Sequence, residues 1–128
     1  TLVGLDATHR CVLAPKDMDA IAAGQGELGR VLAESYAFYR AFYQQALGID
    51  GCCPHDSCAL AYLIRPELFT TARGHLNVVT EGIAEGQTVF APESREFLAP
   101  RWSQTPIITA CLSADGPAVV DWMVDTLK

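Results

Sequence analysis

An imidazole and a carboxylate stand side by side at His55 and Asp56, within the run GCCPHDSC. Histidine titrates closest to neutral pH, so His55 could hold a proton and deliver it to a leaving group as a general acid. Asp56 offers the hard oxygens that Ca²⁺ prefers, but this ion takes about six to eight oxygens, so further ligands must come from elsewhere. Local sequence alone also allows a structural interpretation, in which Asp56 caps a helix and His55 packs against a neighbour.

The cysteines around this pair allow two other kinds of chemistry. Cys52, Cys53, His55 and Cys58 have zinc-binding side chains, yet they crowd into one short stretch, whereas structural zinc sites usually use two well-separated ligand pairs. His55 could instead activate Cys58 as a nucleophile, but no oxyanion-hole signature accompanies them. Burial as a small hydrophobic residue is the better interpretation of Cys58.

Two helices are expected to position the pair. The run GIDGCCP, with two glycines and a proline, predicts a loop, and residues 56–64 after it predict a helix. Upstream, apolar residues recur at helical spacing over residues 27–47, and Gly48 follows as a C-terminal stop. Tyr39 and Tyr43 lie one turn apart on this longer helix, where core packing would explain them as well as a role in a site.

Shorter elements complete the prediction. Residues 2–5 predict a short strand that ends in a loop at Asp6. The runs LNVVTE and QTVFAP predict a hairpin, residues 93–104 a loop, and PIITACL a strand. Ser113 or Asp115 can cap a closing helix. Helices mixed with short apolar strands indicate an α/β fold of which part of the sheet is present.

Composition excludes several classes of partner. The 128 residues carry a net charge of -6 without a compensating basic run, which argues against nucleic acid. No apolar stretch approaches the roughly 20 residues that span a bilayer, so no membrane is expected. Five cysteines, an odd count, favour reduced thiols and the cytoplasm. The chain opens at Thr1 in what reads as the end of a buried strand, and we therefore expect a fragment of a longer protein.

Several separate segments, in order, resemble the inosine-uridine preferring nucleoside hydrolase family. VGLDATH is similar to the family's GLDVT segment, and the aromatic helix SYAFYRAFY follows it. PHDSCALAYLIRPELF is similar to HDPxAVAYLxxPxLF, and LNVVTEGIAEGQTV to a strand pair reading V-x-V-E and G-x-T-V. The resemblance covers most of residues 3–90. It implies that residues 1–128 are the C-terminal portion of one nucleoside hydrolase domain, with an open, mostly parallel sheet, a small β-hairpin and several helices.

The resemblance also implies an activity and the residues that perform it. The parent protein would cleave the N-glycosidic bond of ribonucleosides to ribose and free base, with a Ca²⁺-bound water as nucleophile. His55 takes the position of the acid that protonates the leaving base, and Asp56 that of a calcium ligand. Tyr39 and Tyr43 match helix aromatics that border the base pocket in some members. The implied setting is nucleoside catabolism, such as purine salvage, by a homo-oligomer.

Departures from the family pattern lead to a second hypothesis. The family's N-terminal cluster D-x-D-x-x-x-D-D does not occur here, so we expect the fragment alone to be inactive without that segment. Pro54 stands where an apolar residue usually precedes the histidine, and Ser57 where proline often follows the aspartate. The alternative is a truncated relative that acts as a non-catalytic nucleoside-binding or structural module and exposes apolar edges to a partner.

Overall fold

A mixed four-stranded sheet runs through the molecule. The computed structural model describes residues 1–96, 102 and 104–128. The strand order is β1 (Leu2–Val3), β4 (Ile107–Ala114), β2 (Phe69–Val78) and β3 (Thr88–Pro92). β1 pairs with β4 in parallel, whereas β2 is antiparallel to both β4 and β3. The α/β class and the open sheet are confirmed. Within the described residues, however, the sheet is mixed and not mostly parallel, because a short hairpin connection forces β2 and β3 to be antiparallel.

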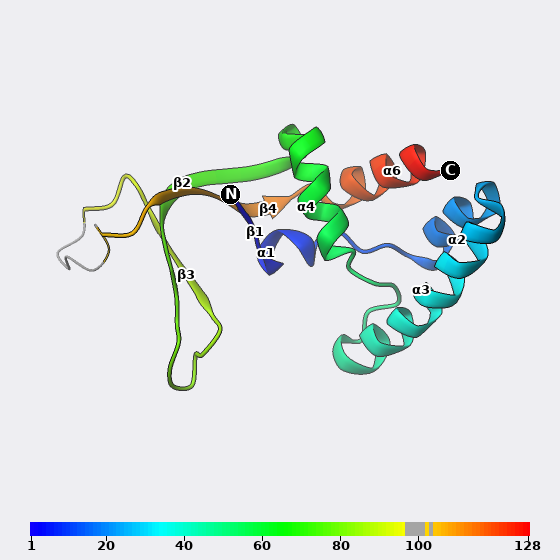
Figure 1. Cartoon of the computed structure of the whole chain (residues 1–128), viewed down its shortest axis with the longest axis horizontal. Coiled ribbons are helices and arrows are strands. Elements are labelled where there is room, and N and C mark those ends of the chain that lie inside the picture. The colour runs from blue at the N-terminus through cyan, green and yellow to red at the C-terminus, as the bar shows by residue number, and fades with distance from the viewer. Residues whose placement is uncertain (97–101, 103) are drawn as a thin grey trace.

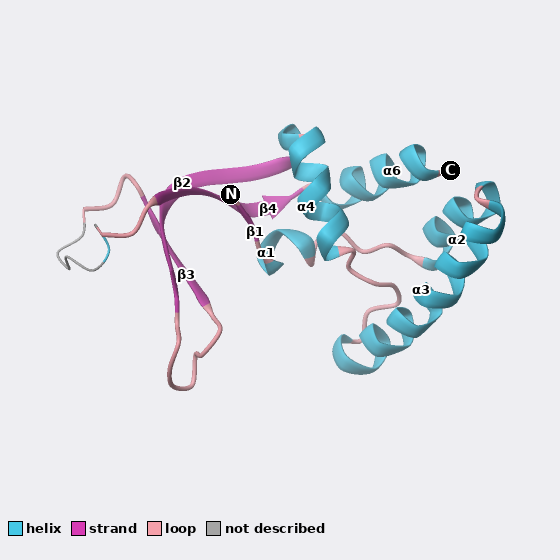
Figure 2. Ribbon diagram, in the orientation of Figure 1, coloured by secondary structure: helices cyan, strands magenta, loops and turns pink. Residues whose placement is uncertain are grey.

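The helices gather at one end and beside the middle of the sheet. They are α1 (Leu5–Thr8), α2 (Pro15–Gly24), α3 (Gly26–Leu47), α4 (His55–Ile64), the 3-10 turn η1 (Pro66–Leu68) and α6 (Gly116–Leu127). Figure 1 shows α2, α3 and α6 together at one end, the β2–β3 hairpin projecting at the other, and α1 and α4 between them. The secondary-structure colouring of Figure 2 shows the same separation of helical and strand regions.

Most predicted elements are present, but β2 begins at Phe69, well before the predicted strand LNVVTE, and the predicted loop at Asp6 is also corrected. Asp6 is not a loop residue, because the chain turns into α1 directly after β1, with the amides of Ala7 and Thr8 bonded to the Gly4 carbonyl. Of the two predicted caps, Asp115 is used: its carboxylate accepts from the Ala118 amide, an arrangement worth about 1 kcal/mol. The predicted loop at residues 93–104 lies partly outside the described residues.

The β2–β3 hairpin diverges from β4 where β2 changes its pairing partner. The first part of β2 pairs with β4, from Phe69 to His75, and the last part pairs with β3, from Gly74 to Val78. At Gly74 a side chain is excluded, since a Cβ atom there would lie 2.2 Å from the Ala91 carbonyl oxygen. The glycine therefore lets β3 approach closely at the bend.

The apolar side chains that recur along α3 are only partly covered by the rest of the chain. Gly29, Tyr36 and Tyr43 are buried on this helix, whereas Tyr39 is 57% exposed and Phe42 is also exposed. The core-packing interpretation therefore holds for Tyr43 and is wrong for Tyr39. Exposed apolar side chains also occur along α4, which agrees with the expectation of uncovered apolar surface. No helix among the described residues is long and apolar enough to cross a membrane.

Candidate functional site

The loop before His55 is fixed against an earlier part of the chain. Gly48, with φ of +69°, ends α3 in the left-handed conformation that glycine tolerates. Leu13 and Cys52 then exchange two backbone hydrogen bonds, of 2.9 and 3.1 Å. Gly51 packs so closely that a Cβ atom would lie 2.7 Å from the Leu13 carbonyl oxygen, which also accepts a 3.0 Å bond from the Tyr36 hydroxyl. The start of α4 is thus held in place by α3 and by the segment before α2.

The His55 imidazole is bonded at both of its nitrogens. Its Nδ1 lies 2.7 Å from Oγ1 of Thr8, on α1, and its Nε2 lies 2.7 Å from Oη of Tyr43, on α3. Thr8 is 1% exposed and Tyr43 is 7% exposed, while His55 itself is half-buried. Three helices therefore meet at this ring, and each ring nitrogen has a hydroxyl partner.

The surroundings of His55 favour its neutral form. Burial lowers the pKa of His55, and His9 lowers it further, with the two ring centroids 5.5 Å apart; Asp56 acts in the opposite direction. Burial likewise raises the pKa of Tyr43, so this hydroxyl keeps its proton. At neutral pH the Tyr43–His55 contact is therefore a hydrogen bond between uncharged groups, held ready to accept one more proton at the imidazole.

Asp56 is the next residue on the same helical turn and is more open to solvent than His55. It is exposed and makes no hydrogen bond or ion pair with other described residues. The capping interpretation is wrong, because Pro54 occupies the cap position and no side chain there bonds the helix amides. A carboxylate at the first turn is nevertheless favoured by the helix dipole. Among the described residues, no group of three or more His, Cys, Asp or Glu could hold a metal ion. Asp56 offers carboxylate oxygens of the kind that Ca²⁺ prefers, but one side chain supplies few of the about six to eight oxygens that this ion takes.

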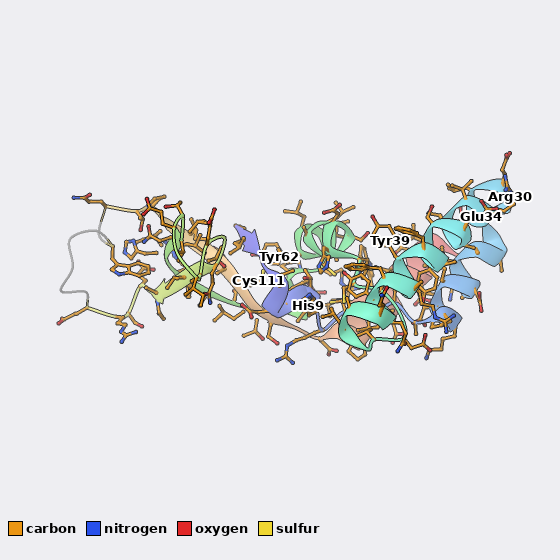
Figure 3. The ribbon with its side chains drawn as sticks, turned by 90° about the horizontal axis from the view of Figure 1, so that it is seen from below. His9, Arg30, Glu34, Tyr39, Tyr62 and Cys111 are labelled. Atoms are coloured by element: carbon orange, nitrogen blue, oxygen red, sulfur yellow. The ribbon has the colours of Figure 1, made fainter. Side chains whose placement is uncertain are left out.

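All four predicted site residues line one cavity. An open pocket of about 290 Å³ is bounded by Tyr39, Tyr43, His55 and Asp56, and its remaining lining residues are Cys52, Cys53, Pro54 and Ser57. This volume is close to the lower end of small-ligand pockets, which begin at about 300 Å³. Figure 3 labels Tyr39, which lies on α3, and His9, which lies just after α1. Tyr43 on α3 and Thr8 on α1 supply the two hydroxyl groups that contact His55. The four predicted residues therefore lie together in space around this pocket.

The two cysteine hypotheses do not fit this geometry. The zinc interpretation is wrong, since the described cysteines and histidines form no ligand group, and all five cysteines are free. Cys58 is fully buried, and its hydrogen bond with Cys11 together with burial raises its pKa, which keeps the thiol protonated. His55 is also occupied by Thr8 and Tyr43, so it cannot serve Cys58 as a base.

Thr8 is the site residue that sequence reasoning missed. It is 47 positions from His55, and nothing in its local sequence marks a threonine that will contact a distant imidazole. The only available signal was its place in VGLDATH, a segment singled out for its resemblance to a family motif. Burial of a polar side chain with one specific partner is a property of the folded chain.

Comparison with known proteins identifies the family to which this chain belongs. A family model described as "Inosine-uridine preferring nucleoside hydrolase" matches residues 1–121. The chain is 31% identical over 126 residues to "Probable uridine nucleosidase 2" of Arabidopsis thaliana, and 36% identical over 128 residues to "Pyrimidine-specific ribonucleoside hydrolase RihA" of Klebsiella pneumoniae subsp. pneumoniae. Each match covers 98% of this chain, which spans 39% of the length of either relative.

Solved structures give the same result for the fold. "Plant nucleoside hydrolase - PpNRh1 enzyme" matches with a TM-score of 0.86 and 25% identity, over 97% of this chain and 39% of that one. "Purine-Preferring Ribonucleoside Hydrolase from Gardnerella vaginalis" matches with a TM-score of 0.78 over 98% of this chain and 38% of that one; at 24% identity it shows the fold alone.

Proposed function

Because the chain belongs to the inosine-uridine preferring nucleoside hydrolase family, we propose that the protein containing it cleaves the N-glycosidic bond of ribonucleosides, releasing ribose and free base. The observation that carries this proposal is the Tyr43–His55 hydrogen bond at the wall of a pocket that Tyr39 and Asp56 also line. A proton donor, an aromatic surface and a carboxylate face the same space, which is what hydrolysis of a nucleoside requires.

His55 acts as the general acid in this proposal. The base would leave as an anion unless it is protonated, and a positioned acid typically contributes about 10²–10⁴-fold to the rate. Nδ1 of His55 faces buried Thr8, so the proton leaves from Nε2, whose partner is the Tyr43 hydroxyl. The acid form is the imidazolium: its Nε2–H passes a proton to the Tyr43 oxygen as Tyr43 gives its own proton to the base, so His55 returns to its neutral form and no tyrosinate remains.

The exposed Tyr39 offers the base a surface to bind. It lines the pocket beside Tyr43 but makes no hydrogen bond to His55, and more than half of it is open to solvent. An aromatic ring in this position provides a flat apolar face for a nucleobase. We therefore assign Tyr39 to substrate binding and Tyr43 to both binding and proton transfer.

Asp56 takes one position in a Ca²⁺ site in this proposal. Its exposed, unbonded carboxylate is available to a cation, and its other ligands would come from outside the described residues. Bound there, the ion would lower the pKa of the attacking water. Since one ligand does not make a calcium site, we expect the 128-residue chain alone to be inactive.

A non-catalytic role is the second candidate for the isolated chain. Leu60, Leu63 and Ile64 of α4 are exposed, which suits a piece that associates with another segment or a further copy in a homo-oligomer.

The free cysteines support our proposal of a cytoplasmic location for the enzyme, in nucleoside catabolism such as purine salvage.

Ribose release tests the enzymatic proposal directly. Full-length protein is assayed on inosine, uridine and cytidine, with Ca²⁺ or with a chelator. We expect ribose release in Ca²⁺, its loss in chelator, and a kcat that is about 10²–10⁴-fold lower for His55→Ala. His75→Ala, in β2, is the matched histidine control. Absence of ribose release in Ca²⁺ would rule out the enzyme, and an unchanged His55→Ala variant would rule out the acid.

A further inference from the structure

The contact between Thr8 and His55 has no part in the proton route described above. Thr8 is almost completely buried, so its hydroxyl does not reach the pocket, and the pocket lining does not include it. Yet this hydroxyl lies 2.7 Å from Nδ1 of His55, an ordinary hydrogen-bond distance. A buried polar group with one partner has its geometry set by that partner.

Packing around Thr8 fixes the contact from both sides. On α1, the Thr8 amide donates to the Gly4 carbonyl over 3.1 Å, which sets the position of the side chain. One turn further along each segment, Cys11 and Cys58 are fully buried in the same core cluster. This packing ties the end of α1 to α4 and keeps Thr8 beside the imidazole.

The protonated form of His55 decides the direction of the Thr8 bond. Both nitrogens of an imidazolium carry a proton, so each needs an acceptor, and a threonine hydroxyl has lone pairs that can accept. In the neutral ring a single proton remains, and which nitrogen keeps it depends on the neighbours. If Thr8 accepts from Nδ1–H, Nε2 of the neutral ring is left to accept from the Tyr43 hydroxyl, which lies 2.7 Å away.

We propose that Thr8 is a positioning residue: its buried hydroxyl accepts from Nδ1–H of His55 and so sets the rotation and the tautomer of the ring, with Nε2 directed at Tyr43. The other groups around the ring do not compete for Nδ1: Tyr43 bonds Nε2, and His9 and Asp56 act on His55 through their charges. The effect of Thr8 on catalysis rests on the proposed function, whereas its effect on the imidazole tautomer does not.

The imidazole tautomer is measured first, in the full-length protein with ¹⁵N-labelled histidine. The nitrogen chemical shifts of His55, assigned by loss of the signal in His55→Ala, report which nitrogen carries the proton at a pH where the ring is neutral. We expect Nδ1–H in the wild type and in Thr8→Ser, and Nε2–H in Thr8→Val, which has the same shape but no hydroxyl. Because the wild-type measurement needs no variant, the proposal can be overturned even if Thr8→Val does not fold: a neutral His55 with its proton on Nε2 would do so.

Kinetics then separate positioning from substrate binding. Thr8→Val should lower kcat about ten- to a hundredfold, as expected for loss of a hydrogen bond to a charged form, with KM unchanged because Thr8 does not reach the pocket. Thr8→Ser should restore most of the activity. Thr126→Val is the matched control, because this helical threonine also loses a hydroxyl bond, to the Trp122 carbonyl, far along the chain from the site.

The possible outcomes discriminate between the two proposals. An unchanged tautomer in a folded Thr8→Val protein overturns the positioning role, whatever happens to kcat. A wild type that carries Nδ1–H and changes tautomer in Thr8→Val, but releases no ribose in Ca²⁺, retains the positioning role and overturns the proposed hydrolase.

Discussion

His55 and Asp56 line the same pocket but differ in how far this chain completes their surroundings. His55 has a hydroxyl at each ring nitrogen, supplied by α1 and α3. Asp56 is exposed and has no bonded partner among the described residues. Under the proposed function, the surroundings of the acid are therefore present in this chain, whereas the metal ligand needs groups from elsewhere.

The largest expected effect comes from Asp56, whose surroundings are incomplete in this chain. Asp56→Asn in the full-length protein should weaken Ca²⁺ binding by more than about tenfold, because even groups behind a metal ligand typically contribute about 10–100-fold. Titration calorimetry with Ca²⁺ measures this, and Asp121→Asn on α6 is the control. His55→Ala should leave the Ca²⁺ affinity unchanged if His55 and Asp56 act independently. Equal affinities for Asp56→Asn and the wild type would contradict the ligand assignment.

A smaller effect is expected at the contact between Tyr43 and His55. Tyr43→Phe removes the hydroxyl bonded to Nε2 of His55 and keeps the buried ring, so kcat should fall about tenfold, the size of one neutral hydrogen bond. The measurement is steady-state ribose release. Tyr62→Phe is the control, because this tyrosine packs its ring against Phe69 and lies outside the pocket. If Tyr43→Phe kept full activity, the proton would not pass through its hydroxyl.

The smallest effect is a displaced pH profile. Burial and, after it, His9 lower the pKa of His55 below its ordinary 6.5, so His9→Gln should raise this pKa part of the way. Since the acid must be protonated, kcat falls as pH rises through this pKa, and the fall should move to higher pH in the variant. The variant should also lose less stability in acid, because a folded-state pKa below the unfolded one makes protonation favour unfolding as pH drops below 6.5.

These two observables test the same contact independently. The pH dependence of kcat and that of the free energy of unfolding, from denaturant titrations, should move together in His9→Gln. A profile that stays in place in both measurements would show that the ring contact between His9 and His55 carries no electrostatic coupling.

Local sequence rules account for most of the elements and for little of the site. Periodic apolar residues predicted α3, and glycine and proline predicted its end and the loop before α4. The same rules could not distinguish Tyr39 from Tyr43, which occupy equivalent positions one turn apart. Only the folded chain distinguishes them: Tyr43 is covered and bonded to His55, whereas Tyr39 is open to solvent.

Long-range contacts account for what remained unpredicted. Thr8 reaches His55 across 47 residues, and its role depends on how α1 packs on α4, which no local pattern specifies. The mixed sheet has the same origin, because strand direction follows from which segments become neighbours in space. The family resemblance identified His55 and Asp56 but carried no information about their separate surroundings.

The pairing of β1 with β4 has a consequence for synthesis on the ribosome. β1 directly precedes α1, and its partners are Ala110 and Cys111, close to the other end of the chain. At about 5–20 residues per second, roughly 5–20 s separate the translation of these two strands. During that interval α1 lacks its contact with β4, so the position of Thr8 beside the imidazole becomes fully fixed only after β4 has been made.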